Sequence, residues 1–295
     1  MPPSLADRVR HLLEAIREMT HRLCGSCIAA AVLLCAHACA PAWAESKPAL
    51  AIKSRAADIS VAIDDRLKAY PGLVADCLAE ARRWFAEKRA EAEKERQERA
   101  DILRDPRRWS LERTYDSRSE VARYVSIVRT DDVDAGGAHP NTTIDTILWD
   151  RSAKKRVSIR PLFKETADNG PTMTALARLV RIAVAAEKIA RDLPSPDDPD
   201  KPGSSFSPEQ YAERDQFVKD GVAPTLLKLG PVTLAPSITP GKSSGLTFHF
   251  SPYAVGAYAE GPYTVFVPWT SFHTYLSPEG AALFGGDRPE IDKDI

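Results

Sequence analysis

Several features that identify common functions are scarce or missing in this sequence of 295 residues. The formal net charge is −1, so no overall basic field favours nucleic acid as a partner. No Walker or dinucleotide-binding pattern occurs, so nucleotide chemistry has no support. The apolar run Ile28–Cys35 is well short of the ~20 residues that a spanning helix needs. We therefore expect a globular protein without a stable membrane span, from a chain that is 43% hydrophobic.

The first 44 residues are predicted to be a signal peptide. A positive charge precedes the apolar run, which ends near Ala42-Trp43-Ala44, and we expect cleavage after Ala44. The region upstream of Met19 is long and charged for the start of such a signal, so Met19 is an alternative start of the protein. Lipidation of Cys39 is the competing interpretation, but His37 fits poorly in the normally small, apolar approach to a lipidated cysteine. The predicted location of the mature protein is periplasmic or secreted.

Cysteine is nearly absent from the predicted mature chain. Cys77 is the only cysteine after residue 44, which excludes an intramolecular disulfide there. Cys77 falls on the apolar stripe of a long helix predicted at about residues 71–100, so a buried and unreactive thiol is expected. From Glu87 to Arg99 this helix becomes mostly charged, which predicts a solvated extension.

The remaining pattern predicts an α+β fold, with an antiparallel β-sheet flanked by α-helices. Strands are predicted at residues 58–63, 120–128, 143–149, 156–159, 245–250 and 263–269. Short loops rather than helices separate the strands at 120–128, 143–149 and 156–159, which favours an antiparallel meander. A well-buried helix is predicted at residues 172–193, and Ser207-Pro-Glu-Gln210 has the capping-box signature of another helix. Residues 194–206 are predicted to be a flexible insertion, and residues 277–295 a loosely attached C-terminal tail.

Two loops of unusual composition are the candidate functional features. In the first, Asp134–Asn141, adjacent glycines allow a sharp fold that holds His139 and Asn141. The second, at residues 250–263, carries three tyrosines among small residues and prolines, and tyrosine combines apolar area with a polar tip. We predict that the loops converge into one ligand-binding patch of His139, Asn141, Tyr253, Tyr258, Pro262 and Tyr263. The alternative is that these side chains only fix the loops to the core.

With both loops in view, the chain resembles a family of extracytoplasmic domains of unknown function. This domain is shared by the lysozyme-sensing anti-sigma factor RsiV and the peptidoglycan deacetylase PdaC. The resemblance covers about residues 58–276 and depends on three stretches: Gly136-Gly-Ala-His-Pro-Asn141, the hairpin from Asp145 through Trp149-Asp150 to Leu162-Phe163, and the run from Phe248 through Tyr253 and Tyr258 to Gly261-Pro262. It implies an α+β domain associated with envelope sensing or cell-wall biology, and it does not imply catalysis.

These observations favour a non-enzymatic binding module whose partner is a cell-wall glycan or a lysozyme-like hydrolase. The alternative is a glycan hydrolase or deacetylase-type enzyme that uses His139 as a base, oriented by a carboxylate such as Asp145. A third possibility is a passive structural protein of the envelope. No cofactor and no metal is predicted, because a metal site at His139 would need more ligands and the remaining histidines, His249 and His273, have no metal-ligand spacing.

Overall fold

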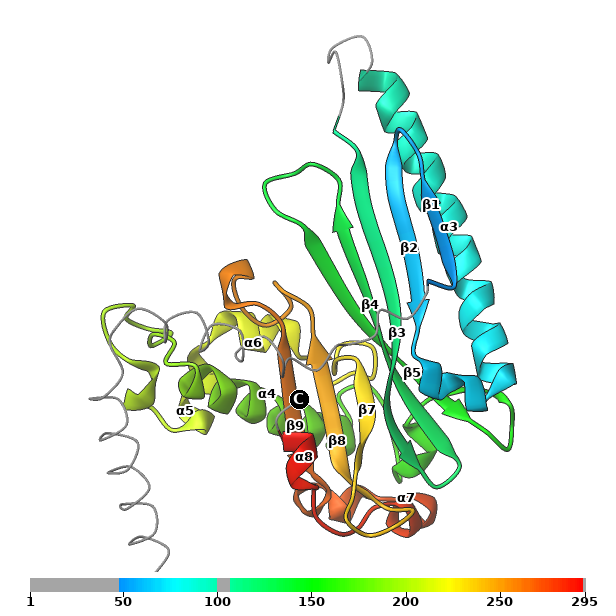
Figure 1. Cartoon of the computed structure of the whole chain (residues 1–295). Coiled ribbons are helices and arrows are strands. Elements are labelled where there is room, and N and C mark those ends of the chain that lie inside the picture. Colours follow the sequence, from blue (N-terminus) through cyan, green and yellow to red (C-terminus); the bar gives the residue numbers. More distant parts are fainter. Residues whose placement is uncertain (1–47, 100–106, 294–295) are drawn as a thin grey trace, which may run out of the picture. The chain divides into compact units, whose positions relative to one another are not determined.

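The structure is a computed structural model that describes residues 48–99 and 107–293 (Figure 1). All of these residues belong to one compact unit. The predicted signal peptide at residues 1–44 lies outside them. Within the described ranges, no helix is long and apolar enough to cross a membrane.

A six-stranded sheet makes up the N-terminal half of this unit, in the order β1-β2-β3-β4-β5-β6. Its strands are β1 (Leu50–Lys53), β2 (Ala57–Ile63), β3 (Trp109–Val121), β4 (Tyr124–Asp134), β5 (Asn141–Asp150) and β6 (Lys155–Val157). Neighbouring strands are antiparallel except β2 and β3, which run parallel with Ile59 opposite Leu111. Buried and exposed positions alternate along β3, as expected for a strand with one face on a core.

The long helix α3 (Pro71–Arg99) packs on this sheet and contacts β2 and β3 (Figure 1). Its buried side chains, among them Leu73, Cys77 and Trp84, join Ile59 and Leu111 in one apolar core. Burial raises the pKa of the Cys77 thiol to about 12, so this cysteine stays protonated and unreactive at neutral pH. The predicted burial of Cys77 is thus confirmed.

A three-stranded antiparallel sheet forms the second layer, in the order β7-β8-β9. The elements here are α4 (Pro171–Ala190), α5 (Pro208–Arg214), α6 (Gln216–Gly221), β7 (Val232–Pro236), β8 (Ser243–Phe250), β9 (Tyr263–Pro268), α7 (Pro278–Leu283) and α8 (Glu290–Lys293). Short 3-10 helices occupy Asp65–Ala69, Arg160–Leu162, Gly203–Ser205, Tyr258–Glu260, Trp269–Ser271 and His273–Tyr275. Apolar side chains of β8, such as Phe248, pack with Val180 and Val184 of α4 in a second core.

Side-chain hydroxyls of the large sheet hold the edge strand β7. Leu234 donates its backbone N–H to Ser126 Oγ at 3.2 Å, and the Ser119 hydroxyl donates back to the Leu234 carbonyl. Val232 N–H donates to Thr146 Oγ1 at 2.9 Å. These bonds satisfy backbone groups that an exposed edge would leave unpaired, and they join the two sheets.

The predicted α+β class is confirmed, but the chain divides its strands between two sheets. Residues 120–128 were predicted to be one strand, but a turn at Ala122 and Arg123 divides them between the end of β3 and the start of β4, and Ala122 adopts a positive φ of 49° there. The tail predicted after residue 276 is also wrong as a loosely attached segment. Leu283 and Phe284 belong to the second core, and Asp292 is buried.

A candidate binding surface formed by two loops

The two loops singled out in the sequence meet in space. The ring of His139, from the β4–β5 loop, stacks on Tyr258, from the β8–β9 loop, with 3.7 Å between ring centroids and 21° between planes. The Tyr258 hydroxyl donates to the carbonyl of Pro140 at 2.8 Å. Side chains 119 residues apart in the sequence thus form one cluster, here called the aromatic surface: His139, Tyr253 and Tyr258.

The hydrogen bonds of His139 indicate which tautomer its neutral ring adopts. Nδ1 lies 2.9 Å from the Pro140 carbonyl, which can only accept, so Nδ1 carries a proton. Nε2 lies 3.3 Å from the Tyr253 hydroxyl and accepts from it in the neutral imidazole. Neither partner is a carboxylate. Asp145, the carboxylate proposed to orient His139, instead pairs with Arg129 at 3.0 Å.

Tyr253 is an exposed member of the aromatic surface. Its side chain belongs to a residue that is 56% exposed, and its ring lies 5.4 Å from that of Tyr258 and 6.0 Å from that of His139. Its backbone has a φ of +70°, a left-handed conformation that residues with a side chain adopt at a cost of roughly 1–2 kcal/mol. Strained backbone of this kind gathers at ligand clamps and active sites, so it is an observation that points to function.

This strain gives a stability prediction with a matched comparison. At position 253, Tyr253→Gly is expected to be more stable than Tyr253→Ala by about 1 kcal/mol, because only glycine adopts a positive φ freely. In helix α6 the order should reverse, with Phe217→Ala more stable than Phe217→Gly by about 1 kcal/mol. Chemical denaturation of the four variants checks this, and a more stable alanine at both positions would contradict the strain.

The other predicted site residues lie at the margin of the aromatic surface or beneath it. Asn141 is exposed as the first residue of β5, opposite Val133. Pro262 is exposed, and its carbonyl accepts a hydrogen bond from Arg191 at 3.1 Å. Tyr263 is only 1% exposed, and its hydroxyl donates to Glu260. Tyr263 therefore supports the loop from inside and offers no surface to a partner.

A buried ionic network beneath the second loop was not predicted from the sequence. Lys188 of α4 lies 2.8 Å from Asp215 and 3.1 Å from Glu260, and its side chain is 2% exposed. Burial by itself would raise the pKa of Glu260, but hydrogen bonds from Tyr263 and the Ala257 N–H, together with Lys188, lower it. The available signal was a lysine in a helix whose apolar residues cover most of its circumference.

A second overlooked pattern is Gly241-Lys-Ser-Ser-Gly245, which matches the Gly-x-Ser-x-Gly spacing of a nucleophilic serine. In the structure its central residue, Ser243, is fully buried at the start of β8. The Ser243 hydroxyl donates to backbone carbonyls of the sheet: its Oγ lies 2.9 Å from the Ala235 oxygen and 2.7 Å from the Gly245 oxygen. A nucleophile needs exposure on a strand-to-helix turn, so this serine is structural.

No group of three or more histidine, cysteine, aspartate or glutamate side chains that could hold a metal ion occurs in the described part of the chain. The arrangement at the aromatic surface offers ring faces, two phenol hydroxyls and an imidazole. Such groups bind a partner by stacking and hydrogen bonding.

Comparison with known proteins adds one family. Residues 162–270 match a family described as "Protein of unknown function (DUF3298)". The matched stretch includes α4, the second sheet and the loop with Tyr253 and Tyr258, and it ends before α7. The loop with His139 lies outside it.

Two solved structures of DUF3298 proteins are similar to the chain. One, from Bacteroides fragilis, is 15% identical, with a TM-score of 0.47, and the match covers 75% of this chain and 85% of that one. The other, from Pseudomonas aeruginosa, is 16% identical, with a TM-score of 0.39 and coverage of 60% and 65%. No curated protein matches the chain.

Proposed function

We propose that the chain is a secreted or periplasmic, non-enzymatic binding module that recognises a cell-wall glycan through the aromatic surface. The observation that carries this proposal is the convergence of two loops on an exposed tyrosine in a strained conformation. Binding residues commonly lie on loops that a rigid sheet holds in place. The resemblance of the chain to the extracytoplasmic domain shared by RsiV and PdaC supports a role at the cell wall.

The chemistry of the aromatic surface suits a neutral sugar. A sugar ring offers C–H groups on its face and hydroxyls around its edge, which complement an aromatic face with polar atoms beside it. Tyr253 and Tyr258 supply rings with few rotatable bonds, so binding costs little conformational entropy. His139 and the two phenol hydroxyls already bond to one another and to Pro140, so the surface is organised before a partner arrives.

The enzyme alternative has less support from this geometry. A general base needs an orienting group within hydrogen-bond reach, and His139 contacts a carbonyl and a phenol. The carboxylate of Asp145 pairs with Arg129. Glycan turnover that is unchanged in His139→Ala would remove this alternative.

The aromatic surface gives a direct binding prediction. Tyr253→Ala and Tyr258→Ala are each expected to weaken retention on purified peptidoglycan about 5- to 100-fold, because each removes a stacking ring worth roughly 1–3 kcal/mol. Ile238→Ala is the matched control, since Ile238 is exposed and lies outside both loops. Quantitative co-sedimentation with peptidoglycan measures the effect.

Lysozyme is tested in parallel by pull-down. Retention of lysozyme but not peptidoglycan, lost in the same tyrosine variants, would move the partner from the glycan to a lysozyme-like hydrolase. Retention of neither ligand would reject both named partners. Unchanged binding in both tyrosine variants would show that the aromatic surface is not the binding site.

A further inference from the structure

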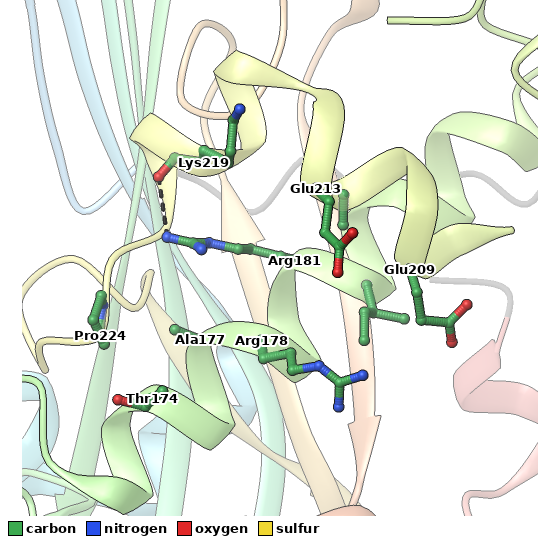
Figure 2. A pocket seen from close by; sticks show the side chains of 10 residues that line it. Thr174, Ala177, Arg178, Arg181, Glu209, Glu213, Lys219 and Pro224 are labelled. Carbon is green, nitrogen blue, oxygen red and sulfur yellow. Dashed lines mark hydrogen bonds between the residues drawn. The ribbon is translucent and has the colours of Figure 1, made fainter. Parts of the chain in front are cut away.

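A cavity of about 350 Å³ opens between helix α4 and the helices α5 and α6 (Figure 2). Its floor is apolar and includes Ala177 and Ile182 of α4 and Ala212 of α5. Its volume is at the small end of the range of roughly 300–1,000 Å³ for sites that bind small molecules. None of its lining residues belongs to the aromatic surface.

Arg181 forms one wall of this cavity and is already engaged. Its Nε and Nη2 donate to the Val222 carbonyl at 2.9 and 2.6 Å, and Nη2 also donates to the Lys219 carbonyl at 3.3 Å (Figure 2). These acceptors lie at the C-terminal end of α6, where helix carbonyls lack partners within the helix. Arg181 therefore fixes the shape of the cavity and leaves ligand binding to other charged groups.

Charges of both signs stand at the opening. Arg178 comes from α4, while Glu209 and Glu213 come from α5, so the cationic and anionic groups lie on different helices (Figure 2). Arg178 lies close enough to Glu209 to contribute to lowering the pKa of that carboxyl, after the Glu209 backbone N–H and the Ser207 hydroxyl. Among the residues that the structure describes, Arg178 and Glu213 have no hydrogen-bond or ion-pair partner within 4.0 Å.

We propose that this cavity binds a short zwitterionic peptide with apolar side chains. The peptide carboxylate would pair with Arg178, its ammonium with Glu213, and its methyl groups would cover Ala177, Ile182 and Ala212. A ligand with one charge would leave either Arg178 or Glu213 without a partner, whereas a zwitterion can pair with both of these side chains. The apolar floor disfavours a ligand with polar side chains because their groups would lose hydration without gaining partners.

The alanine dipeptide Ala-Ala is the probe, and isothermal titration calorimetry measures its binding to the full chain. N-acetyl-Ala-Ala lacks the ammonium, and Ala-Ala-amide lacks the carboxylate. Each capped peptide is expected to bind at least tenfold more weakly than Ala-Ala, since a charge-assisted hydrogen bond contributes roughly 1.5–3 kcal/mol. Equal affinity for either capped peptide, or no saturable binding of Ala-Ala, would overturn the proposal.

Two variants assign the contacts. Arg178→Gln should weaken Ala-Ala at least tenfold and leave the binding of Ala-Ala-amide unchanged, while Glu213→Gln should weaken Ala-Ala and leave N-acetyl-Ala-Ala unchanged. Arg82→Gln and Glu87→Gln on the exposed face of α3 are the matched controls. Ala-Ala affinity that does not change in either cavity variant would contradict the assignment. Failure here is distinct from failure of glycan binding, because no cavity residue belongs to the aromatic surface.

Discussion

Replacing Lys188 with methionine is expected to lower the free energy of unfolding by about 3–5 kcal/mol, the usual cost of leaving buried charges without their partner. The Lys188 ammonium contacts two carboxylates, those of Asp215 and Glu260, and both are largely buried. Methionine fills a similar volume but cannot neutralise either one. For a domain of this size the change corresponds to a fall in Tm of about 10 °C.

The same network supports the aromatic surface. Asp215 caps α6 by accepting the Val218 N–H at 3.2 Å, and Glu260 accepts the Ala257 N–H at 2.8 Å within the second loop. Glu260 also ends the short 3-10 helix that begins at Tyr258. Loss of Lys188 would therefore loosen the loop that presents Tyr253 and Tyr258.

Lys94→Met is the control for this prediction. Lys94 forms an exposed i,i+4 pair with Glu98 at 3.8 Å on α3, and such pairs contribute little to stability. Its loss should change the free energy of unfolding by less than about 0.5 kcal/mol. Urea denaturation of both variants gives the comparison, and equally small effects would show that the buried network does not contribute to stability.

Local signals predicted the parts of the fold that depend on neighbouring residues. The capping box at Ser207 is present, with Gln210 and Ser207 bonded to each other's backbone N–H groups. The buried helix predicted at residues 172–193 corresponds to α4, because an apolar stripe specifies a helix regardless of its partners. The meeting of the two loops was also predicted, but from their composition and the family resemblance rather than from any contact pattern.

Long-range pairing could not be predicted in the same way. The turn between β3 and β4 contains Ala122 and Arg123 and has no glycine or proline to mark it. The parallel pairing of β2 with β3 joins segments separated by α3, and the sequence specifies neither partner. The network around Lys188 brings together three segments that are distant in the sequence. In the sequence, each of its carboxylates therefore resembles an ordinary surface charge.

Acid is expected to destabilise the fold through His249. This residue is 5% exposed, and its Nε2 lies 2.9 Å from Thr233 Oγ1. Burial, and then the positive charge of Arg118, lower the pKa of His249 from 6.5 to about 4, against the opposing effect of Asp292. The folded state therefore resists protonation, whereas the unfolded chain takes up a proton once the pH falls below 6.5.

Because the unfolded chain binds this proton more readily than the folded chain, the free energy of unfolding decreases as the pH falls. His249 contributes its full stabilisation above about pH 6.5, and that contribution is lost as the pH falls toward 4, by about 3 kcal/mol in total. Arg118 and Arg288 both donate to Asp292, so the one carboxylate that acts on His249 is already paired and could not neutralise a charged imidazole. Protonation thus adds an unpaired charge to a buried region.

A non-titrating variant separates this effect from the protonation of carboxylates. His249→Gln can keep a hydrogen bond to Thr233, and its free energy of unfolding should fall less between pH 7 and 4 than that of the parent protein, by about 3 kcal/mol. His273→Gln, at an exposed histidine, should follow the parent profile. We expect the two stability profiles to differ only between about pH 6.5 and pH 4, where the unfolded chain binds the proton and the folded chain does not. Parallel profiles for the parent and His249→Gln would show that the buried imidazole does not control acid stability.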